Sequence, residues 1–528
     1  MTNPTDLPTE AVFEAIRQGM RQVHSEVGLA QRDQHPRAIG VVRARFEVAD
    51  VPAEYALGLF AGRRVFDAWI RFSNGKELHD DRQPDVHGMA IQVLDVPGQR
   101  QGGDPLRSLC QDFVLVDHPV FFARDARHFL EFLELKGRQA KELSGAAGNP
   151  SELTSLKQRQ LREMIGGFPV LTHFFSQPEN VLASTYSSQT PFQFGPMAGR
   201  WFAKPLPGET PLPVGQDTPH RLSEALQASL STGCEVRFAF GIQLQSDLQR
   251  MPLEDATDPW TGAPQITLAT ITIPPQEIAG EIPAQFAEAL EFNPWHALVE
   301  HLPLGSINQV RRLAYADSQQ ARRKARQLPE TRTGEANRAM LQRFFECFAK
   351  RDAMGMRACL HPDVEFQDIG FDLRGDEVGA MWSMITTPKH PDQVQHPIQV
   401  QLHSSTVTGS TGEAHWSCQY LLIPDKGGAP LPIENTTTSK FEFVDGLIRR
   451  QHDDCDFWKW FRQVKKEFWI GDIMSWIDQL EDWLEKATGL DVPPDIEQKA
   501  RHGVRQTARR KLDEFLMSNP FARYTRES

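Results

Sequence analysis

Alternating hydrophobic and polar positions recur through the first half of the chain and predict an antiparallel β-barrel. Short β-branched and aromatic runs separated by turns fill residues 38–93, and the alternation returns at 184–207, 235–245 and 265–275. Such period-two runs are typical of half-buried strands. The pattern predicts about eight strands, a number that suits a closed barrel with a cofactor at its mouth.

Helical spacing predicts the elements around this barrel. Residues 9–29 place Val12, Ile16, Met20 and Val23 on one helical face, and residues 124–147 and 151–165 also favour helices. The stretch from residue 318 to 334 is polar, charged and broken by proline, which is typical of an exposed linker.

Beyond the linker the order changes to two helices, a short strand, a helix and four strand-like runs, which predicts a separate α+β domain. A last helix is predicted after residue 464, where apolar residues repeat at intervals of four and three. The alternatives for this stripe are docking on its own domain or a homodimer seam. The domain prediction is therefore 1–325 for the barrel, 326–333 for the linker, 334–463 for the second domain and 464–528 for a helical extension.

Composition narrows the classes of function and location. The net charge of −12 and pI near 5.8 argue against a nucleic-acid partner. Residues 1–6 lack a secretory signal, and no apolar run reaches the ~18 residues that an integral membrane segment needs. Six scattered cysteines without a C-x-x-C pair fit reduced thiols. These features predict a cytoplasmic protein.

The stretch from His301 to Arg323 contains the first candidate for chemistry. Arg311 precedes Tyr315 by four residues, so on a helix the guanidinium lies against the phenol. A cation there stabilises a phenolate, and tyrosinate is one of the few axial ligands that proteins give to haem iron.

Five motifs in order extend this hypothesis. They are RDQHPRAIGVVRARFEV (32–48), WIRFSNG (69–75), DVHGMAIQV (85–93), HPVFFARDARHF (118–129) and RRLAYADSQQARR (311–323). Together they resemble the haem-binding core of the catalases over roughly residues 30–325.

The resemblance implies haem b as the cofactor and a set of roles for the matching residues. It implies that His35 is the distal base, with Ser73 beside it, and that Tyr315 is the iron ligand, tuned by Arg311. The residues that it implies around the haem are Arg32, Arg71, Phe129 and Arg322.

One position departs from the catalase pattern. Val116 stands three residues before the proline of the P-x-F-F motif, where catalases have an asparagine, and Asp117 follows it. Valine cannot hydrogen-bond peroxide, and an ionised carboxylate accepts but cannot donate. With His35, Ser73 and Asp117 as the predicted catalytic set, the sequence favours a bulkier hydroperoxide over rapid disproportionation of hydrogen peroxide.

The second domain resembles the SnoaL-like, nuclear-transport-factor-like α+β cone in the order of its elements and in HPDVEFQD and FEFVDGLIRR. Cones of this kind hold a pocket between a curved sheet and its helices. His452 and Asp454 lie two apart on the last strand, so both face one side and suit a general base. The polar residues predicted to point into the pocket are Asp368, Trp382, His415, Asn435, His452 and Asp454.

The sequence thus predicts an α+β protein that processes hydroperoxides with haem, as a peroxidase or a converter of organic or lipid hydroperoxides with weak catalase activity, and that carries a fused small-molecule-binding cone. A peroxide or lipid hydroperoxide is the expected substrate, and a homodimer through the cone or the last helix is the expected assembly. Two alternatives stay open: a haem sensor or storage protein without turnover, and a hydrolase or cyclase that acts in the cone.

Overall fold

The computed structural model describes most of the chain between residues 10 and 463. The described residues are 10–27, 32, 34–62, 65–75, 80–101, 105–107, 109–145, 150–208, 212–326, 334–368, 371–388, 390–422, 430–456, 459 and 463. The predicted C-terminal helix with its apolar stripe and residues 327–333 of the predicted linker lie outside them. Residues 318–326, whose composition indicated an exposed linker, instead continue the helix Ser306–Arg326, which corrects that part of the expectation.

The chain divides into two compact units, and neither is a continuous segment. Unit 1 comprises Met1–Gly103, Cys110–Glu281 and Glu291–Leu328. Unit 2 comprises Asp104–Leu109, Ile282–Leu290 and Pro329–Ser528. Two short segments that precede the predicted linker in sequence therefore belong to the second unit.

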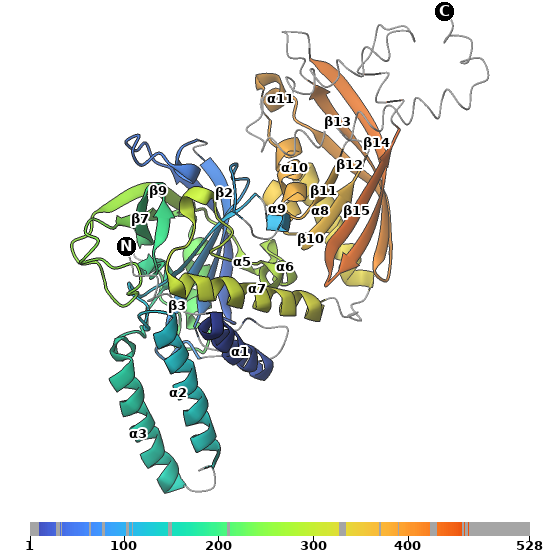
Figure 1. Ribbon diagram of the computed structural model, residues 1–528. Helices are drawn as coiled ribbons and strands as arrows, with labels where there is room; N and C mark the ends of the chain where they lie inside the picture. The colour runs from blue at the N-terminus through green and yellow to red at the C-terminus, as the bar shows by residue number, and fades with distance from the viewer. Residues whose placement is uncertain are drawn as a thin grey trace, which may run out of the picture. The chain divides into compact units, whose positions relative to one another are not determined.

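Unit 1 is built around an antiparallel sheet that closes on itself (Figure 1). Its strands are β1 (Ala38–Val48), β2 (Val65–Asn74), β3 (His87–Val93), β4 (Gln111–Val116), β5 (Tyr186–Ser187), β6 (Phe192–Phe194), β7 (Met197–Pro205), β8 (Val236–Leu244) and β9 (Gln265–Ile273). The order is β5-β4-β3-β2-β1-β9-β8-β7-β6, and a β5–β7 pairing closes all of these except β6 into a barrel. The predicted eight-stranded antiparallel barrel is confirmed.

The interior of this barrel is a packed aromatic core. Phe113 lies with its ring centroid 4.6 Å from that of Phe240, 5.1 Å from that of Trp201 and 6.1 Å from that of Phe46. All four side chains are almost fully buried. Because side chains fill the barrel interior, functional chemistry in unit 1 has to lie on the barrel's outer face or at its ends.

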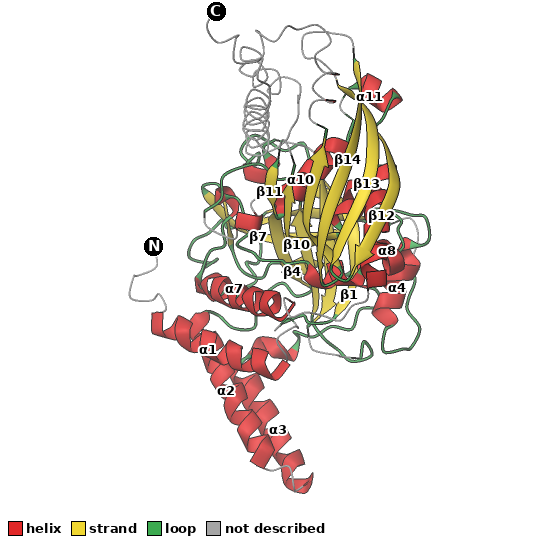
Figure 2. Ribbon diagram, turned by 90° about the vertical axis from the view of Figure 1, so that its right-hand side faces the viewer, coloured by secondary structure: helices red, strands yellow, loops and turns green. Residues whose placement is uncertain are grey.

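Helices cover one end of the barrel (Figure 1). Those of unit 1 are α1 (Glu10–Val27), α2 (Ala126–Gly145), α3 (Pro150–Gly167), α4 (Arg221–Leu230), α5 (Ile278–Glu281) and α7 (Ser306–Arg326). The apolar face predicted for the first helix packs against α2 and α7, where Ile16, Ala126 and Val310 form a buried cluster. Helices α2 and α3 form a long antiparallel hairpin that extends from the barrel (Figure 2).

Unit 2 is a six-stranded curved sheet with helices on its concave face (Figure 2). Its strands are β10 (Leu360–Gln367), β11 (Asp372–Arg374), β12 (Gln399–Thr408), β13 (Thr411–Leu422), β14 (Leu431–Val444) and β15 (Leu447–Cys455), in the order β11-β10-β15-β14-β13-β12. Its helices are α6 (Ala284–Ala289), α8 (Gly334–Lys350), α9 (Ala353–Arg357), α10 (Asp376–Thr386) and α11 (Pro391–Gln395). The predicted α+β class with two sheets is confirmed.

The two inserted segments are held within unit 2 by specific contacts. Arg107 donates to the Pro362 carbonyl at 2.9 Å and forms a 3.2 Å ion pair with Asp376. Helix α6 lies against β10. The core of unit 2 therefore includes residues that precede the cone in sequence.

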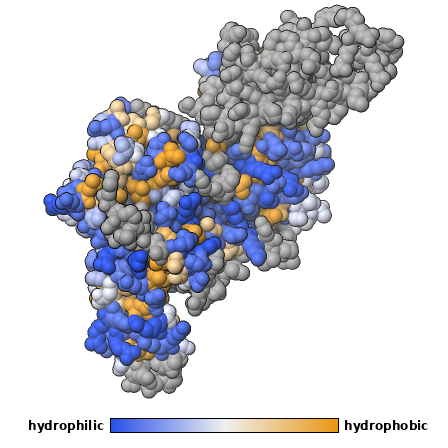
Figure 3. Space-filling view, in the orientation of Figure 1, coloured by the Kyte–Doolittle hydropathy of each residue, from blue (hydrophilic) through white to orange (hydrophobic). Residues whose placement is uncertain are grey.

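The described residues on one face of the molecule are mostly hydrophilic (Figure 3). On the face shown in Figure 3, hydrophobic residues of the described part form small separate patches. Within the described residues, no helix combines the length and the apolarity needed to cross a membrane.

Candidate functional site

His35 lies just before β1 in a left-handed backbone conformation, with φ of +54°. Its ring packs over Gly88 of β3, which pairs with Ser73 of β2. A Cβ at position 88 would lie 2.7 Å from Ser73 Oγ and 2.9 Å from His35 Nδ1. Because glycine has no side chain, the imidazole reaches Ser73, whose Oγ lies 3.3 Å from His35 Nδ1.

The electrostatic surroundings of His35 keep the ring neutral. Burial of the imidazole is the main cause and the Arg71 guanidinium the second, and together they lower the pKa of His35 to about 4. Arg71 is itself buried and donates from Nη2 to the Pro36 carbonyl at 3.1 Å. At neutral pH the His35 imidazole therefore retains a lone pair that accepts a proton.

Val116, the last residue of β4, pairs directly with Gly88. Residues that face each other across an antiparallel pair lie on the same side of the sheet. The Val116 methyl groups therefore face the side that His35 and Ser73 occupy, and Val116 has no hydrogen-bond donor to offer there.

Asp117 belongs to a different network from the one predicted for it. Its Oδ1 accepts from the His87 backbone N–H at 2.7 Å, and its Oδ2 accepts from His87 Nδ1 at 2.9 Å and from the Ser176 hydroxyl. His87 precedes Gly88, so strand alternation turns its side chain to the other face. Asp117 thus anchors His87 and Ser176, and its charge raises the pKa of His35 against the larger effect of burial.

Helix α7 carries the predicted iron ligand. The Arg311 guanidinium lies 5.6 Å from the centroid of the half-buried Tyr315 ring, as the four-residue spacing predicts. Arg311 also donates to Thr190 Oγ1 at 3.2 Å and to Asn308 Oδ1 at 3.1 Å. These contacts fix the cation above the phenol ring.

Polar groups continue down the Tyr315 face of α7. Gln319, one turn later, is buried, and its Nε2 donor has no hydrogen-bond partner. Arg322, two turns after Tyr315, is also buried. A phenol beside a cation, a buried donor left without an acceptor and a buried guanidinium fit an iron porphyrin, whose metal takes the phenolate and whose propionates accept from donors.

The remaining two residues of the haem prediction lie in the same unit. Phe129 is on α2 and packs in the cluster of α1, α2 and α7, with its ring centroid 5.9 Å from that of Phe121. Arg32 is half-buried before β1. The residues that the catalase motifs identify thus lie on β2 and β3, in the segment before β1, on α2 and on α7.

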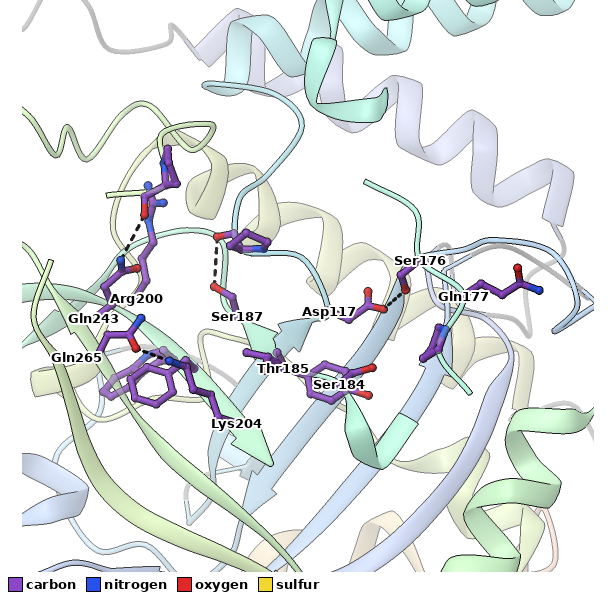
Figure 4. Close-up of a pocket in the computed structure, with 16 residues that line it drawn as sticks. Asp117, Ser176, Gln177, Ser184, Thr185, Ser187, Arg200, Lys204, Gln243 and Gln265 are labelled. Atoms are coloured by element: carbon purple, nitrogen blue, oxygen red, sulfur yellow. Dashed lines mark hydrogen bonds between the residues drawn. The ribbon is translucent and has the colours of Figure 1, made fainter. Parts of the chain in front are cut away.

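A cavity of about 620 Å³ opens on the other side of the Asp117 network (Figure 4). It lies along β5 and β7, and Lys204 donates to Gln265 across it. The labelled lining residues are Asp117, Ser176, Gln177, Ser184, Thr185, Ser187, Arg200, Lys204, Gln243 and Gln265. Sequence reasoning did not identify this cavity, because its residues come from seven separate stretches that share no motif.

In unit 2 the predicted pocket residues fall on two faces. Trp382 is almost fully buried, and Asp368 and Asn435 are half-buried. His415, His452 and Asp454 are exposed, and His415 pairs outward with Glu413 at 3.2 Å. The prediction that these last three residues point into the cone is therefore wrong, because the alternation of β13 and β15 has the opposite phase.

The residues that do point inward from β15 are Gln451 and Asp453. Gln451 Nε2 donates to both oxygens of Asp453, at 2.9 and 3.2 Å. Burial raises the pKa of Asp453 to about 7, with a smaller contribution from the Asp368 carboxylate and against a hydrogen bond from Ser439. The cone interior therefore contains a carboxyl group that titrates near neutral pH.

Two further buried polar atoms accompany Asp453. Gln451 Oε1 and Trp382 Nε1 have no hydrogen-bond partner. Trp382 packs on Phe366, which is the ladder partner of Gln451, with ring centroids 5.5 Å apart. One acceptor and one donor are thus available near the Asp453 carboxyl.

Comparison with known proteins gives a separate result for each half of the chain. A family model described as a SnoaL-like domain matches residues 341–451. Catalase A from Saccharomyces cerevisiae is 17% identical with a TM-score of 0.40, covering 56% of this chain and 62% of its own. A fungal catalase is 15% identical with the same TM-score, covering 56% and 60%, and a bacterial catalase is 17% identical with a TM-score of 0.40, covering 63% and 65%. No curated protein sequence matches the chain significantly.

Both resemblances predicted from the motifs, to catalases and to SnoaL-like domains, are found among known proteins. The chain spans less than two thirds of the length of the solved catalases. A TM-score of 0.40 carries no conclusion about activity. The case for a haem site rests on the side chains of β1 to β3 and α7.

Proposed function

We propose that unit 1 binds haem b and processes hydroperoxides, with Tyr315 as the iron ligand and His35 as the general base. The observation that carries this proposal is the arrangement of His35, whose neutral imidazole packs on Gly88 and lies 3.3 Å from the Ser73 hydroxyl. The left-handed backbone at His35 costs conformational energy that a histidine with a purely structural role does not need. Such strain is common at functional sites.

One tyrosine and three arginines would hold the cofactor. Tyr315 would ligate the iron through its phenol oxygen, with the Arg311 guanidinium held over its ring. Buried Arg71 and Arg322, with Arg32, would pair with the propionates by bidentate contacts. Haem bound in this way would supply an iron centre at which the oxygen–oxygen bond of a hydroperoxide is cleaved.

The chain's own contribution to the reaction is proton transfer. His35 accepts the hydroxyl proton of the bound hydroperoxide and returns it to the leaving oxygen. The contact with Ser73 holds the imidazole in one orientation during both transfers. A pKa of about 4 keeps His35 in the accepting form at neutral pH.

Val116 shapes the substrate preference. Where a donor would fix the small, polar hydrogen peroxide molecule, Val116 presents methyl groups on the face of Gly88. An apolar wall favours the alkyl chain of an organic or lipid hydroperoxide through the hydrophobic effect. We therefore expect a higher kcat/KM for a lipid hydroperoxide than for hydrogen peroxide.

The test is an absorption spectrum of the full chain expressed with added haem precursor, compared with Tyr315→Phe. We expect a Soret band with tyrosinate-ligated ferric character that is lost or shifted in Tyr315→Phe. Titration with hydrogen peroxide and with a fatty-acid hydroperoxide then measures turnover. Binding without consumption of either would favour a haem sensor over an enzyme.

Tyr420→Phe is the matched control, because it removes a phenol from the cone sheet in unit 2. Its spectrum should equal that of the wild type. A wild-type protein that takes up no haem, or a spectrum that Tyr315→Phe leaves unchanged, would refute the assignment of this site.

A second candidate function, acid–base chemistry in the cone, is favoured by Asp453. Its carboxyl has a pKa of about 7 and lies near the unpaired Gln451 Oε1 and Trp382 Nε1. A small molecule with one donor and one acceptor would satisfy both atoms while Asp453 exchanges a proton with it. Screening small aromatic ketones and esters against wild type and Asp453→Asn tests this candidate, and equal behaviour of both proteins would exclude it.

A further inference from the structure

Three side chains of different metal-binding chemistry meet inside unit 1, away from His35 and Tyr315. They are Cys110, Asp112 and His296, and all three are buried. One ligand atom from each, a sulfur, a carboxylate oxygen and an imidazole nitrogen, lies within 4.8 Å of the other two. Cys110 and Asp112 are two apart at the start of β4, so strand alternation turns both to one side.

The carboxylate of Asp112 is only half satisfied by the protein. Its Oδ2 accepts from the Asn293 backbone N–H and from His296 Nδ1, each at 2.8 Å. Its Oδ1 is buried and has no hydrogen-bond partner. An unpaired buried carboxylate oxygen is costly, and a cation beside it removes that cost.

We propose that Cys110, Asp112 and His296 bind a divalent transition-metal ion, with Zn²⁺ as the expected occupant. Thiolate, imidazole and carboxylate are the ligands that Zn²⁺ takes in proteins, whereas Mg²⁺ and Ca²⁺ take oxygen ligands. Tetrahedral bonds of about 2.0–2.3 Å place ligand atoms roughly 3.3–3.8 Å apart. The three ligand atoms lie within 4.8 Å of one another, so the widest separation has to shorten by no more than about 1–1.5 Å on binding.

Proton bookkeeping follows from the ligand chemistry. The ion binds Cys110 as the thiolate, so the thiol proton is released to solvent on binding. His296 binds through a nitrogen lone pair, and Asp112 binds through a carboxylate oxygen. Binding therefore weakens as the pH falls.

The ion would join two parts of unit 1 that are distant in sequence. The Asp112 backbone N–H already donates to the His296 carbonyl at 2.8 Å, and the His296 N–H closes a turn on the Asn293 carbonyl. This turn lies ten residues before the start of α7 at Ser306. A bound ion would fix β4 to the segment that leads into the helix with Tyr315, whether or not haem binds there.

The test is the metal content of the full chain expressed in minimal medium with either Zn²⁺ or Co²⁺ and then passed over a weak chelating resin. We expect close to one equivalent of metal per chain in the wild type, and with Co²⁺ a thiolate-to-metal charge-transfer band. Cys110→Ser should lose the band and most of the metal. Zn²⁺ should also raise the melting temperature of the wild type and not that of Cys110→Ser.

Cys234→Ser is the matched control, because Cys234 is exposed and lies outside the cluster. It should keep the metal content, the band and the thermal shift of the wild type. Circular dichroism of Cys110→Ser checks that the fold is retained, and if it is not, Cys110→Ala replaces it. Wild-type protein with no metal above the level of the Cys110 variant, or a Co²⁺ spectrum without the thiolate band, would overturn the proposal.

Discussion

The barrel and the cone place their polar chemistry on opposite sides of their sheets. The barrel encloses Phe46, Phe113, Trp201 and Phe240, while His35 and Ser73 lie on the strand face opposite this core. The cone encloses aromatic rings as well, but Asp453 lies among them with Gln451.

In the barrel, the residues that stabilise the fold differ from the candidate functional residues. In the cone, both kinds of residue lie in the same interior. A closed barrel of this size is filled by its own side chains, so the core stabilises the fold and the outer face is free to vary. A curved sheet closed only by helices can accommodate polar groups on its concave side. A substitution in the barrel should therefore change either stability or activity, whereas a substitution inside the cone should change both.

The largest effect expected is from the barrel core. Phe113→Ala removes a ring that contacts three other aromatic rings, and we expect the free energy of unfolding of unit 1 to fall by about 3–5 kcal/mol. Hydrogen exchange followed by mass spectrometry should show faster exchange in β1 to β4. The strands β12 to β14 of unit 2 should exchange at the wild-type rate, and equal acceleration in both units would contradict the separation of the two cores.

The elements of both units were predictable from the sequence because local spacing determines them. Strand alternation gave the eight-stranded barrel, and the four-residue spacing gave the contact of Arg311 with Tyr315. The motif DVHGMAIQV predicted that Gly88 lies on a strand. The function of Gly88, to leave room for the His35 ring, became clear only from the register that pairs Gly88 with Ser73. The two short segments that join unit 2 have no local signal, since only tertiary contacts assign them.

The phase of β15 shows why the cone site was not predictable. In the segment RQHDDCD nearly every residue is polar, so a period of two is present in both phases and neither is marked as buried. Because histidine is a common general base, the sequence predicted His452 and Asp454 on the inner face. The buried residues of this strand are Gln451 and Asp453. Polar residues inside a core remove the hydrophobic signal on which such predictions depend.

Asp453 offers the next test, in which stability and function should change together. Its folded-state pKa of about 7 lies above the ordinary value of 3.8, so well below pH 3.8 the group is protonated in both states and has no effect. As the pH rises toward 7 the unfolded chain ionises first, and stability falls by at most roughly 4 kcal/mol. Above pH 7 the loss is complete.

Asp453→Asn should remove this dependence, because the amide does not ionise. Thermal melts of both proteins between pH 4 and 8 should show wild type losing stability relative to Asp453→Asn as the pH rises, with little further divergence above pH 7. Asp454→Asn, on the exposed phase of the same strand, is the control and should follow the wild type. Parallel curves for wild type and Asp453→Asn would contradict an elevated pKa.

On the outer face of the barrel, Gly88→Ala should affect activity more than stability. The added methyl group meets Ser73 Oγ at 2.7 Å and His35 Nδ1 at 2.9 Å, so the imidazole has to move. A displacement of about 1 Å of a catalytic group costs on the order of 10²-fold in rate. We expect hydroperoxide turnover to fall by about that factor, measured beside Gly137→Ala, whose methyl group meets no atom within 4 Å.

The smallest effect is expected from pH on the barrel reaction, and it contrasts directly with the cone. Burial and Arg71 hold the pKa of His35 near 4, so the base is neutral from pH 5 upward and protonated only below its pKa. The kcat/KM for hydroperoxide should therefore be almost flat between pH 5.5 and 8 and fall tenfold for each pH unit well below 4. A profile of initial rates in the wild type measures this, with the haem spectrum followed at each pH to exclude loss of cofactor. A fall in kcat/KM with its midpoint near pH 6.5, the ordinary pKa of histidine, would contradict the lowered pKa. It would show that the His35 ring is exposed to solvent.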